Sequence, residues 1–135
     1  MFTLIYVSSA FKKLNHNELL EMLNISVKNN LERAVTGFLI YSDGNFIQAL
    51  EGNESDVEFI FSKILNDKRH HDIFVLDRSA IEHRNFEDWS MNFKILNDDE
   101  TRRLNGYMPI SKLNTLTGNG VALKLLLGFA ENNRA

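Results

Sequence analysis

Apolar and polar positions along this chain follow two periods, one typical of β-strands and the other of α-helices. Five short segments rich in β-branched and aromatic residues are the predicted strands: Phe2–Ser8, Ala34–Tyr41, Phe46–Leu50, Ile73–Leu76 and Trp89–Leu96. Asp43 and Gly44 lie between the second and third segments, and an Asp-Gly pair between apolar runs is a strong signal for a tight hairpin.

Two longer segments carry apolar residues at helical spacing. The first covers residues 18–33, with Asn15 or Asn17 as N-cap and an apolar face of Leu20, Leu23, Val27 and Leu31. The second is capped by Asn53 or Ser55 and ends near Lys68, with an apolar face of Val57, Phe61, Ile64 and Leu65. The order βαββαββ predicts a ferredoxin-like α+β fold, in which two helices cross one face of a mixed sheet.

Strand parity predicts that the sheet face away from these helices is apolar as well. If Leu4, Tyr6 and Gln48 face the helices, Ile5 and Ile47 point the other way and need a cover. The tail offers one, because residues 98–105 and 121–129 have helical patterns. We therefore expect a domain over residues 1–96 and a C-terminal helical extension, residues 97–135, that packs on the far face of the sheet.

Composition narrows the classes of function. The 135 residues suit one compact domain, and 44% of them are hydrophobic, enough for a core without disulfides. Because the chain has no cysteine, thiolate metal sites and cysteine nucleophiles are excluded. A net charge of −3 without a basic stripe argues against direct nucleic-acid binding. No signal peptide or membrane span is evident, so a soluble, cytoplasmic protein is expected.

The four histidines do not suggest a metal site, because no acidic residues stand at ligand spacing from them. His70 and His71 are interpreted as caps of the second helix, where a cation suits the helix dipole.

Three polar residues occupy positions where a plain core would hold apolar ones. Tyr6 and Gln48 lie on the strand face assigned to the helices, and Asn30 follows Leu23 and Val27 by helical steps. Leaving a buried amide without partners costs about 1–3 kcal/mol, so these converging side chains suggest a polar ligand between helices and sheet. Taken singly, each has an ordinary alternative: a core tyrosine with its hydroxyl at the rim, an edge-strand glutamine, and a helix cap.

Six stretches give this constellation a wider context. They are Leu-Ile-Tyr-Val-Ser at 4–8, Asn-Asn at 29–30, Thr-Gly-Phe-Leu-Ile-Tyr at 36–41, Gly-Asn-Phe-Ile-Gln-Ala-Leu-Glu-Gly at 44–52, Asp-Lys-Arg-His at 67–70 and Arg-Asn-Phe-Glu-Asp-Trp-Ser-Met at 84–91. In this order and spacing they resemble the BLUF family, blue-light sensors that use FAD. The resemblance runs from Phe2 to about Ile95.

The resemblance implies a role for each matching residue. Tyr6 matches the photoactive tyrosine, the electron and proton donor, and Gln48 matches the glutamine that bridges it to the flavin at N5 and C4=O. Asn30 matches the asparagine that holds the C4=O and N3 edge, and Asn29 is its neighbour at the mouth of the site. A glutamine amide is donor and acceptor at once, so it can change its hydrogen bonds by rotation or tautomerism without changing charge.

Four further positions match the family. Lys63 and Asp67 match second-helix side chains near the pyrimidine end of the flavin, and at one helical turn apart they form either a charge-balanced pair in the site or an exposed ion pair. Position 63 is commonly arginine or histidine in the family, so lysine predicts a weaker or re-angled contact. Trp89 and Met91 match the pair whose placement changes with the light state, the signal relay.

A photoreceptor switch without net chemistry, and therefore not an enzyme, is the expected function. FAD is the implied cofactor, and FMN or riboflavin stays open because no adenine or diphosphate site is evident. The sequence carries no effector domain, so an unidentified effector or regulator protein is expected to receive the signal; a homo-oligomer stays open. Two alternatives are a light-independent flavin-binding protein or flavoenzyme, and a flavin-free interaction module or acylphosphatase-like hydrolase on the same fold.

Overall fold

The computed structural model describes residues 1–12, 14–42, 44–84, 86 and 92–95. Its elements, in chain order, are β1 (Phe2–Ala10), α1 (His16–Glu32), β2 (Thr36–Ser42), β3 (Asn45–Gly52), α2 (Glu54–Leu65), β4 (His70–Ala80) and β5 (Asn92–Ile95). This is the predicted order of strands and helices. The predicted C-terminal extension, residues 97–135, lies outside the described residues.

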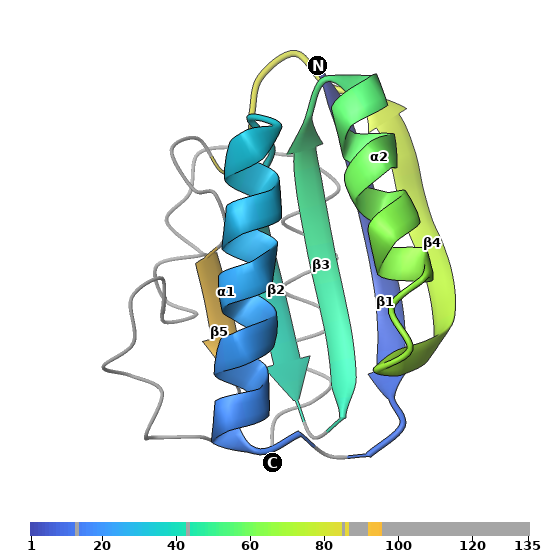
Figure 1. The fold of residues 1–135 in the computed structure, drawn as a ribbon. Helices are drawn as coiled ribbons and strands as arrows, with labels where there is room; N and C mark the ends of the chain where they lie inside the picture. The colour runs from blue at the N-terminus through green and yellow to red at the C-terminus, as the bar shows by residue number, and fades with distance from the viewer. Residues whose placement is uncertain (13, 43, 85, 87–91, 96–135) are drawn as a thin grey trace.

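One five-stranded sheet has the order β4-β1-β3-β2-β5, and both helices lie on the same face of it (Figure 1). The pairs β1–β3, β1–β4 and β2–β3 are antiparallel, whereas β5 runs parallel to β2. Because α1 connects β1 to β2 across β3, and α2 connects β3 to β4 across β1, the arrangement is ferredoxin-like. The predicted α+β fold with a mixed sheet is confirmed.

Local signals account for two of the junctions between elements. Ser42 pairs with Asn45, and Gly44 in the turn between them has a φ of 92°, a conformation that favours glycine. α1 begins with a capping box, in which the Asn15 side chain accepts from the Glu18 N–H and the Glu18 side chain accepts from the Asn15 N–H. The hairpin and the first of the two proposed caps are thus confirmed.

The second helix ends at Leu65, earlier than the predicted end near Lys68. The backbone N–H of Asp67 donates to the Ile64 carbonyl at 3.1 Å, three residues back, and this tighter turn closes the helix. As a result, Asp67 lies in the connection to β4 rather than one helical turn along the same face from Lys63.

Side chains from both helices and the sheet form the main core. The buried members of this cluster are Leu4, Tyr6, Leu14, Leu19, Leu23, Val35, Leu39, Tyr41, Phe46, Leu50, Val57, Ile60 and Phe61. The predicted apolar faces were wrong at one residue in each helix, because Leu31 is 65% exposed and Leu65 is 53% exposed. The helical period places Leu19, Leu23 and Asn30 inward, and Leu31 follows Asn30 on the outer side of the last turn.

The opposite face of the sheet is also buried. Ile5, Ile47 and Ala49 expose at most 1% of their surface, as strand parity predicted for an apolar second face. Phe86, from the connection between β4 and β5, packs on Phe38 with ring centroids 5.9 Å apart. The tail that was predicted to cover this face lies outside the described residues.

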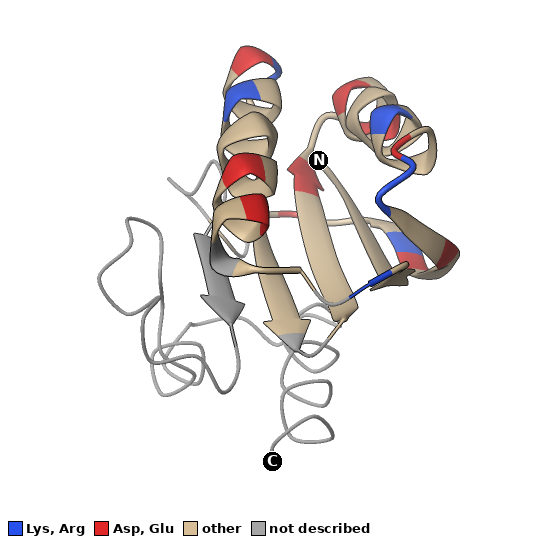
Figure 2. Cartoon of the chain, turned by 60° about the horizontal axis from the view of Figure 1, so that its bottom comes forward, with Lys and Arg blue, Asp and Glu red and all other residues tan. Residues whose placement is uncertain are grey.

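Charged residues of both signs are interspersed along the two helices, and the central strands carry few (Figure 2). Within the described ranges, no helix is both long enough and apolar enough to cross a membrane.

Candidate functional site

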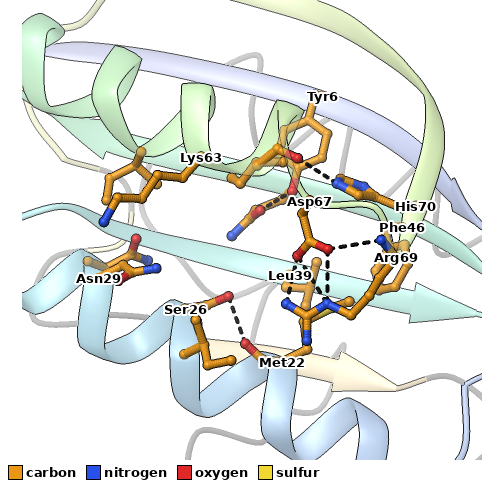
Figure 3. Close-up of a pocket in the computed structure, with 15 residues that line it drawn as sticks. Tyr6, Met22, Ser26, Asn29, Leu39, Phe46, Lys63, Asp67, Arg69 and His70 are labelled. Atoms are coloured by element: carbon orange, nitrogen blue, oxygen red, sulfur yellow. Dashed lines mark hydrogen bonds and ion pairs between the residues drawn. The ribbon is translucent and has the colours of Figure 1, made fainter.

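A cavity opens between the two helices and the sheet, on the side of the main core (Figure 3). The empty space within it, with the open mouth included, is about 630 Å³. The predicted cofactor-binding residues all line it: Tyr6, Asn29, Asn30, Gln48, Lys63 and Asp67. The predicted signal-relay residues, Trp89 and Met91, lie outside the described residues.

Tyr6 and Gln48 stand directly opposite each other in the sheet. In the β1–β3 register they are partners, so both side chains point to the helices. The Tyr6 hydroxyl donates a hydrogen bond to Oε1 of Gln48, and each residue is only 4% exposed. Sheet register therefore turns two residues on a shared face into a bonded pair.

The Tyr6 side chain is held as a neutral phenol. Burial raises the pKa of Tyr6 well above its usual value, and the nearby charge of Asp67 raises it further. The ring packs against Phe61 of α2, with centroids 5.5 Å apart. Tyr6 thus keeps its proton across the physiological pH range and acts as a hydrogen-bond donor in the cavity.

The C-terminal half of α1 brings two amides to the cavity. Asn30 is 1% exposed, and its backbone carbonyl accepts from the N–H groups of Arg33 and Val35 at 3.2 and 2.9 Å. These bonds fix the end of α1 against the start of β2. Asn29 is half-buried at the edge of the cavity, where it lies across from Lys63 of α2 (Figure 3).

Asp67 forms its ion pair with Arg69, so the predicted pairing with Lys63 is wrong. Its carboxylate accepts from Arg69 Nη2 at 2.6 Å, from Nε at 3.0 Å and from the Arg69 backbone N–H at 2.9 Å (Figure 3). The side-chain hydrogen bond from Arg69 holds the pKa of Asp67 below its usual range, although partial burial opposes this. Because α2 ends before Asp67, Lys63 lies elsewhere, with Nζ 5.0 Å from the ring centroid of Phe59.

Arg69 and His70 also line the cavity, and neither was predicted as a site residue. The Asp-Lys-Arg-His stretch contains both residues, but spacing alone does not show which way side chains point at the junction between α2 and β4. His70 Nδ1 lies 2.9 Å from Ser8 Oγ, and Nε2 lies 2.8 Å from the carbonyl oxygen of Ile64. Since a carbonyl only accepts, Nε2 carries a proton. His70 thus ties β1 to the end of α2, and its predicted capping contact is confirmed.

His71, the other proposed cap, points elsewhere. Its Nδ1 lies 3.0 Å from Oδ2 of Asp72, and its ring centroid lies 4.3 Å from that of Phe11. The prediction was wrong for this residue because neighbouring positions of a strand face opposite sides. In the part of the chain that the structure describes, no three histidines or acidic residues are grouped to hold a metal ion.

Comparison with known proteins identifies the family. The family described as BLUF, sensors of blue light using FAD, matches residues 1–92. The chain therefore belongs to the BLUF family of sensors of blue light that use FAD.

Individual relatives differ in how much of their length the match covers. Photoactivated adenylate cyclase subunit beta from Euglena longa is 37% identical over 90 residues, which is 65% of this chain and 10% of that protein. The structure of Klebsiella pneumoniae BlrP1 with FMN and cyclic diGMP has a TM-score of 0.81 at 30% identity, covering 97% of this chain and 34% of BlrP1. BlrB, a BLUF protein in its dark state, has a TM-score of 0.69 at 28% identity over 97% of this chain and 96% of BlrB. The chain thus spans a small part of the cyclase and of BlrP1.

The donor set of the cavity fits the flavin that the family uses. Apolar side chains from both helices line the walls, among them Met22, Ile25 and Ile60, and can contact the two faces of a planar ring. The polar edge of a flavin alternates acceptors with an N–H donor, and the amides of Asn30 and Gln48 offer both kinds of group. The residues present therefore match the chemistry of an oxidised flavin.

Proposed function

We propose that this chain is a blue-light photoreceptor in which Tyr6 and Gln48 form the photoactive pair. The hydrogen bond between the buried Tyr6 hydroxyl and Gln48 Oε1 inside the cavity carries this proposal. It connects the phenol of Tyr6, which lines the cavity, to an amide that can exchange donor and acceptor roles.

When bound and excited by blue light, an oxidised flavin supplies a strong one-electron oxidant. Tyr6 would give an electron to the excited flavin, and its hydroxyl proton would pass along the existing hydrogen bond to Gln48 Oε1 while the amide releases a proton from Nε2 to the flavin. Gln48 then re-pairs its hydrogen bonds by rotation or tautomerism, without a change of charge. Because both side chains are buried, water does not compete for the proton, and the electron and the proton would both return to Tyr6. No net chemistry follows, so the chain is not a turnover enzyme.

The cofactor is held by residues of both helices. Asn29 and Asn30 bind its polar edge from α1, and Asp67, fixed by Arg69, lies at the other side of the cavity. Lys63 contacts the cofactor through a compact ammonium group instead of the planar guanidinium of an arginine, so the angle of this contact differs from that in relatives with arginine. FAD is the family's cofactor, and FMN or riboflavin fits the same residues because they contact the ring rather than the tail.

We further propose that residues 1–96 form the flavin-binding domain, with Trp89 and Met91 as the signal relay and residues 97–135 as an extension. A separate effector or regulator protein receives the signal. Support comes from BlrB, a BLUF protein of which this chain covers 96%. In contrast, this chain covers only 10% of the cyclase and 34% of BlrP1.

Absorption spectroscopy of the purified chain tests the proposal. We expect a yellow protein whose flavin band shifts slightly to the red in blue light and recovers in darkness. Tyr6→Phe is expected to bind flavin without this shift, and a matched control, Tyr41→Phe, is expected to keep it. A flavin spectrum that light does not alter, or a full photocycle in Tyr6→Phe, would contradict the proposal. Oxidation of NADH in darkness would favour a flavoenzyme instead.

A further inference from the structure

Glu51 is a fully buried acid that the proposed photochemistry does not use. It lies near the end of the central strand β3, and it is 0% exposed. Side chains alternate along a strand, so Glu51 points to the sheet face opposite Gln48 and the cavity. Its Oε1 accepts a hydrogen bond of 2.7 Å from the backbone N–H of Phe86. Burial of a carboxylate is costly without hydrogen bonds, so this contact offsets part of the desolvation cost of Glu51.

Arg84 makes three hydrogen bonds at the same corner of the sheet. Nη1 donates to Thr36 Oγ1 at 2.8 Å and to the backbone carbonyl of Glu51 at 2.9 Å, and Nη2 donates to the Ala34 carbonyl at 2.7 Å. Thr36 and Glu51 are register partners in the β2–β3 pair. One planar guanidinium therefore bonds to both strands of this hairpin, a geometry that a lysine does not reproduce.

These contacts attach the connection between β4 and β5 to the hairpin at two places. Phe86 is fully buried and packs on Phe38 of β2. Phe38 is also the register partner of Asn92, where β5 begins. Residues 87–91, which include the proposed relay residues Trp89 and Met91, connect these two attachments along the chain.

Gln48 lies on the same hairpin, three positions before Glu51. It pairs with Tyr6 on β1 and with Leu39 on β2, so β3 is hydrogen-bonded on both sides. The β3 backbone therefore connects the residue that lines the cavity with the residue that is buried on the far face of the sheet.

We propose that Glu51 and Arg84 are positioning residues of the photocycle. They attach the β4–β5 connection to the hairpin that carries Gln48, so a rearrangement of Gln48 displaces this connection. The contacts favour the state in which Tyr6 bonds to Gln48, and weakening them slows the thermal return to that state. The inference rests on the proposed role of Gln48.

Nuclear magnetic resonance of the flavin-loaded, ¹⁵N-labelled full chain tests the displacement directly. We expect the amide signal of Phe86 and the Nε signal of Arg84 to shift under blue light. Both should return in darkness with the rate constant of the flavin absorbance. If the flavin band shifts while these two signals stay unchanged, the inference is overturned and the proposed function stands. If the flavin band itself does not respond to light, the proposed function fails first.

Dark recovery of two variants tests the positioning role. Glu51→Gln keeps the shape and an acceptor oxygen but removes the charge, and charge-assisted hydrogen bonds are the stronger kind. We expect the same flavin spectrum and the same size of red shift, with recovery slower by about tenfold, equivalent to about 1.4 kcal/mol in the barrier. Arg84→Lys keeps the positive charge but loses the planar guanidinium that bonds to both strands. Dark recovery of this variant should also be slower.

The matched control is Glu82→Gln, which removes the same charge from an exposed residue of the same connection. Its recovery rate is expected to equal that of the unaltered chain. If Glu51→Gln does not fold, the result for Arg84→Lys decides the question. Recovery in the folded variants that is as fast as in Glu82→Gln, or faster, overturns the inference.

Discussion

Removing one oxygen atom from Tyr6 is expected to change both the stability and the photochemistry of the chain. Tyr6→Phe keeps the ring, so the packing against Phe61 at 5.5 Å is retained. The change removes the donor that bonds to Gln48 Oε1 in a buried environment. A buried polar atom that loses its partner costs about 1–3 kcal/mol. Because a neutral amide can turn toward another partner, we expect about 1–2 kcal/mol, the lower part of that range.

Urea unfolding of the flavin-free chain measures this cost. With a denaturant slope of about 2 kcal/mol per molar urea, the middle of the usual range, the midpoint should fall by roughly 0.5–1 M. Tyr41→Phe is the matched control, because the Tyr41 hydroxyl accepts from the buried Leu14 N–H at 3.0 Å. Its midpoint should fall by a similar amount, since that change also leaves a buried group without its partner.

The two variants separate stability from photochemistry. Only Tyr6→Phe is expected to abolish the red shift, because Tyr41 does not line the cavity. The reasoning is refuted if Tyr6→Phe leaves the midpoint unchanged, or if Tyr41→Phe loses the red shift while it still binds flavin.

Three further predictions concern stability. Arg69→Gln should lower the free energy of unfolding by about 0–1 kcal/mol at pH 7. Because Arg69 holds the pKa of Asp67 below its usual value, this difference should vanish as the pH falls below the unfolded pKa of about 3.9 and through the lower folded pKa. Urea unfolding at pH 7 and at a pH below the folded pKa checks it. Asn15→Ala should lower stability by about 0.5–2 kcal/mol through loss of the cap, with the red shift retained, and an unchanged thermal midpoint would argue against the cap. Leu23→Ala should cost about 2–5 kcal/mol, whereas Leu31→Ala should stay within about 0.5 kcal/mol, as urea midpoints will show.

The limits of sequence-based prediction are clear in β4. The predicted segment, Ile73–Leu76, covers the apolar centre of a strand that runs from His70 to Ala80. β4 is an edge strand, so charged residues such as Asp77 and Arg78 are tolerated along it and hide the alternation. Asp72 has a φ of 53°, and the register to β1 shifts near this point, which breaks the period again.

The site could be predicted as a set of faces but not as a set of contacts. Strand parity placed Tyr6 and Gln48 on one face, and helical steps placed Asn30 opposite them. The bond between Tyr6 and Gln48 depends on β1–β3 register, which no local pattern contains. The Asp67–Arg69 pair depends on where α2 ends. At that end the Asn66 side chain donates from Nδ2 to the Ser62 carbonyl at 3.0 Å, a contact that the apolar pattern does not indicate.

The central strand itself explains why one buried polar residue was predicted and another was not. Gln48 interrupts a run of apolar residues, so its burial is visible in the pattern, whereas Glu51 precedes Gly52 and reads as a polar strand end. In the folded chain both are buried, on opposite faces of β3, and each is bonded to a neighbouring segment. A strand that served only the core would not bury an amide on one face and a carboxylate on the other, because each needs bonds to offset its desolvation. Burial of both Gln48 and Glu51 is expected if β3 links the cavity to the β4–β5 connection. The Glu51 and Arg84 variants test this link.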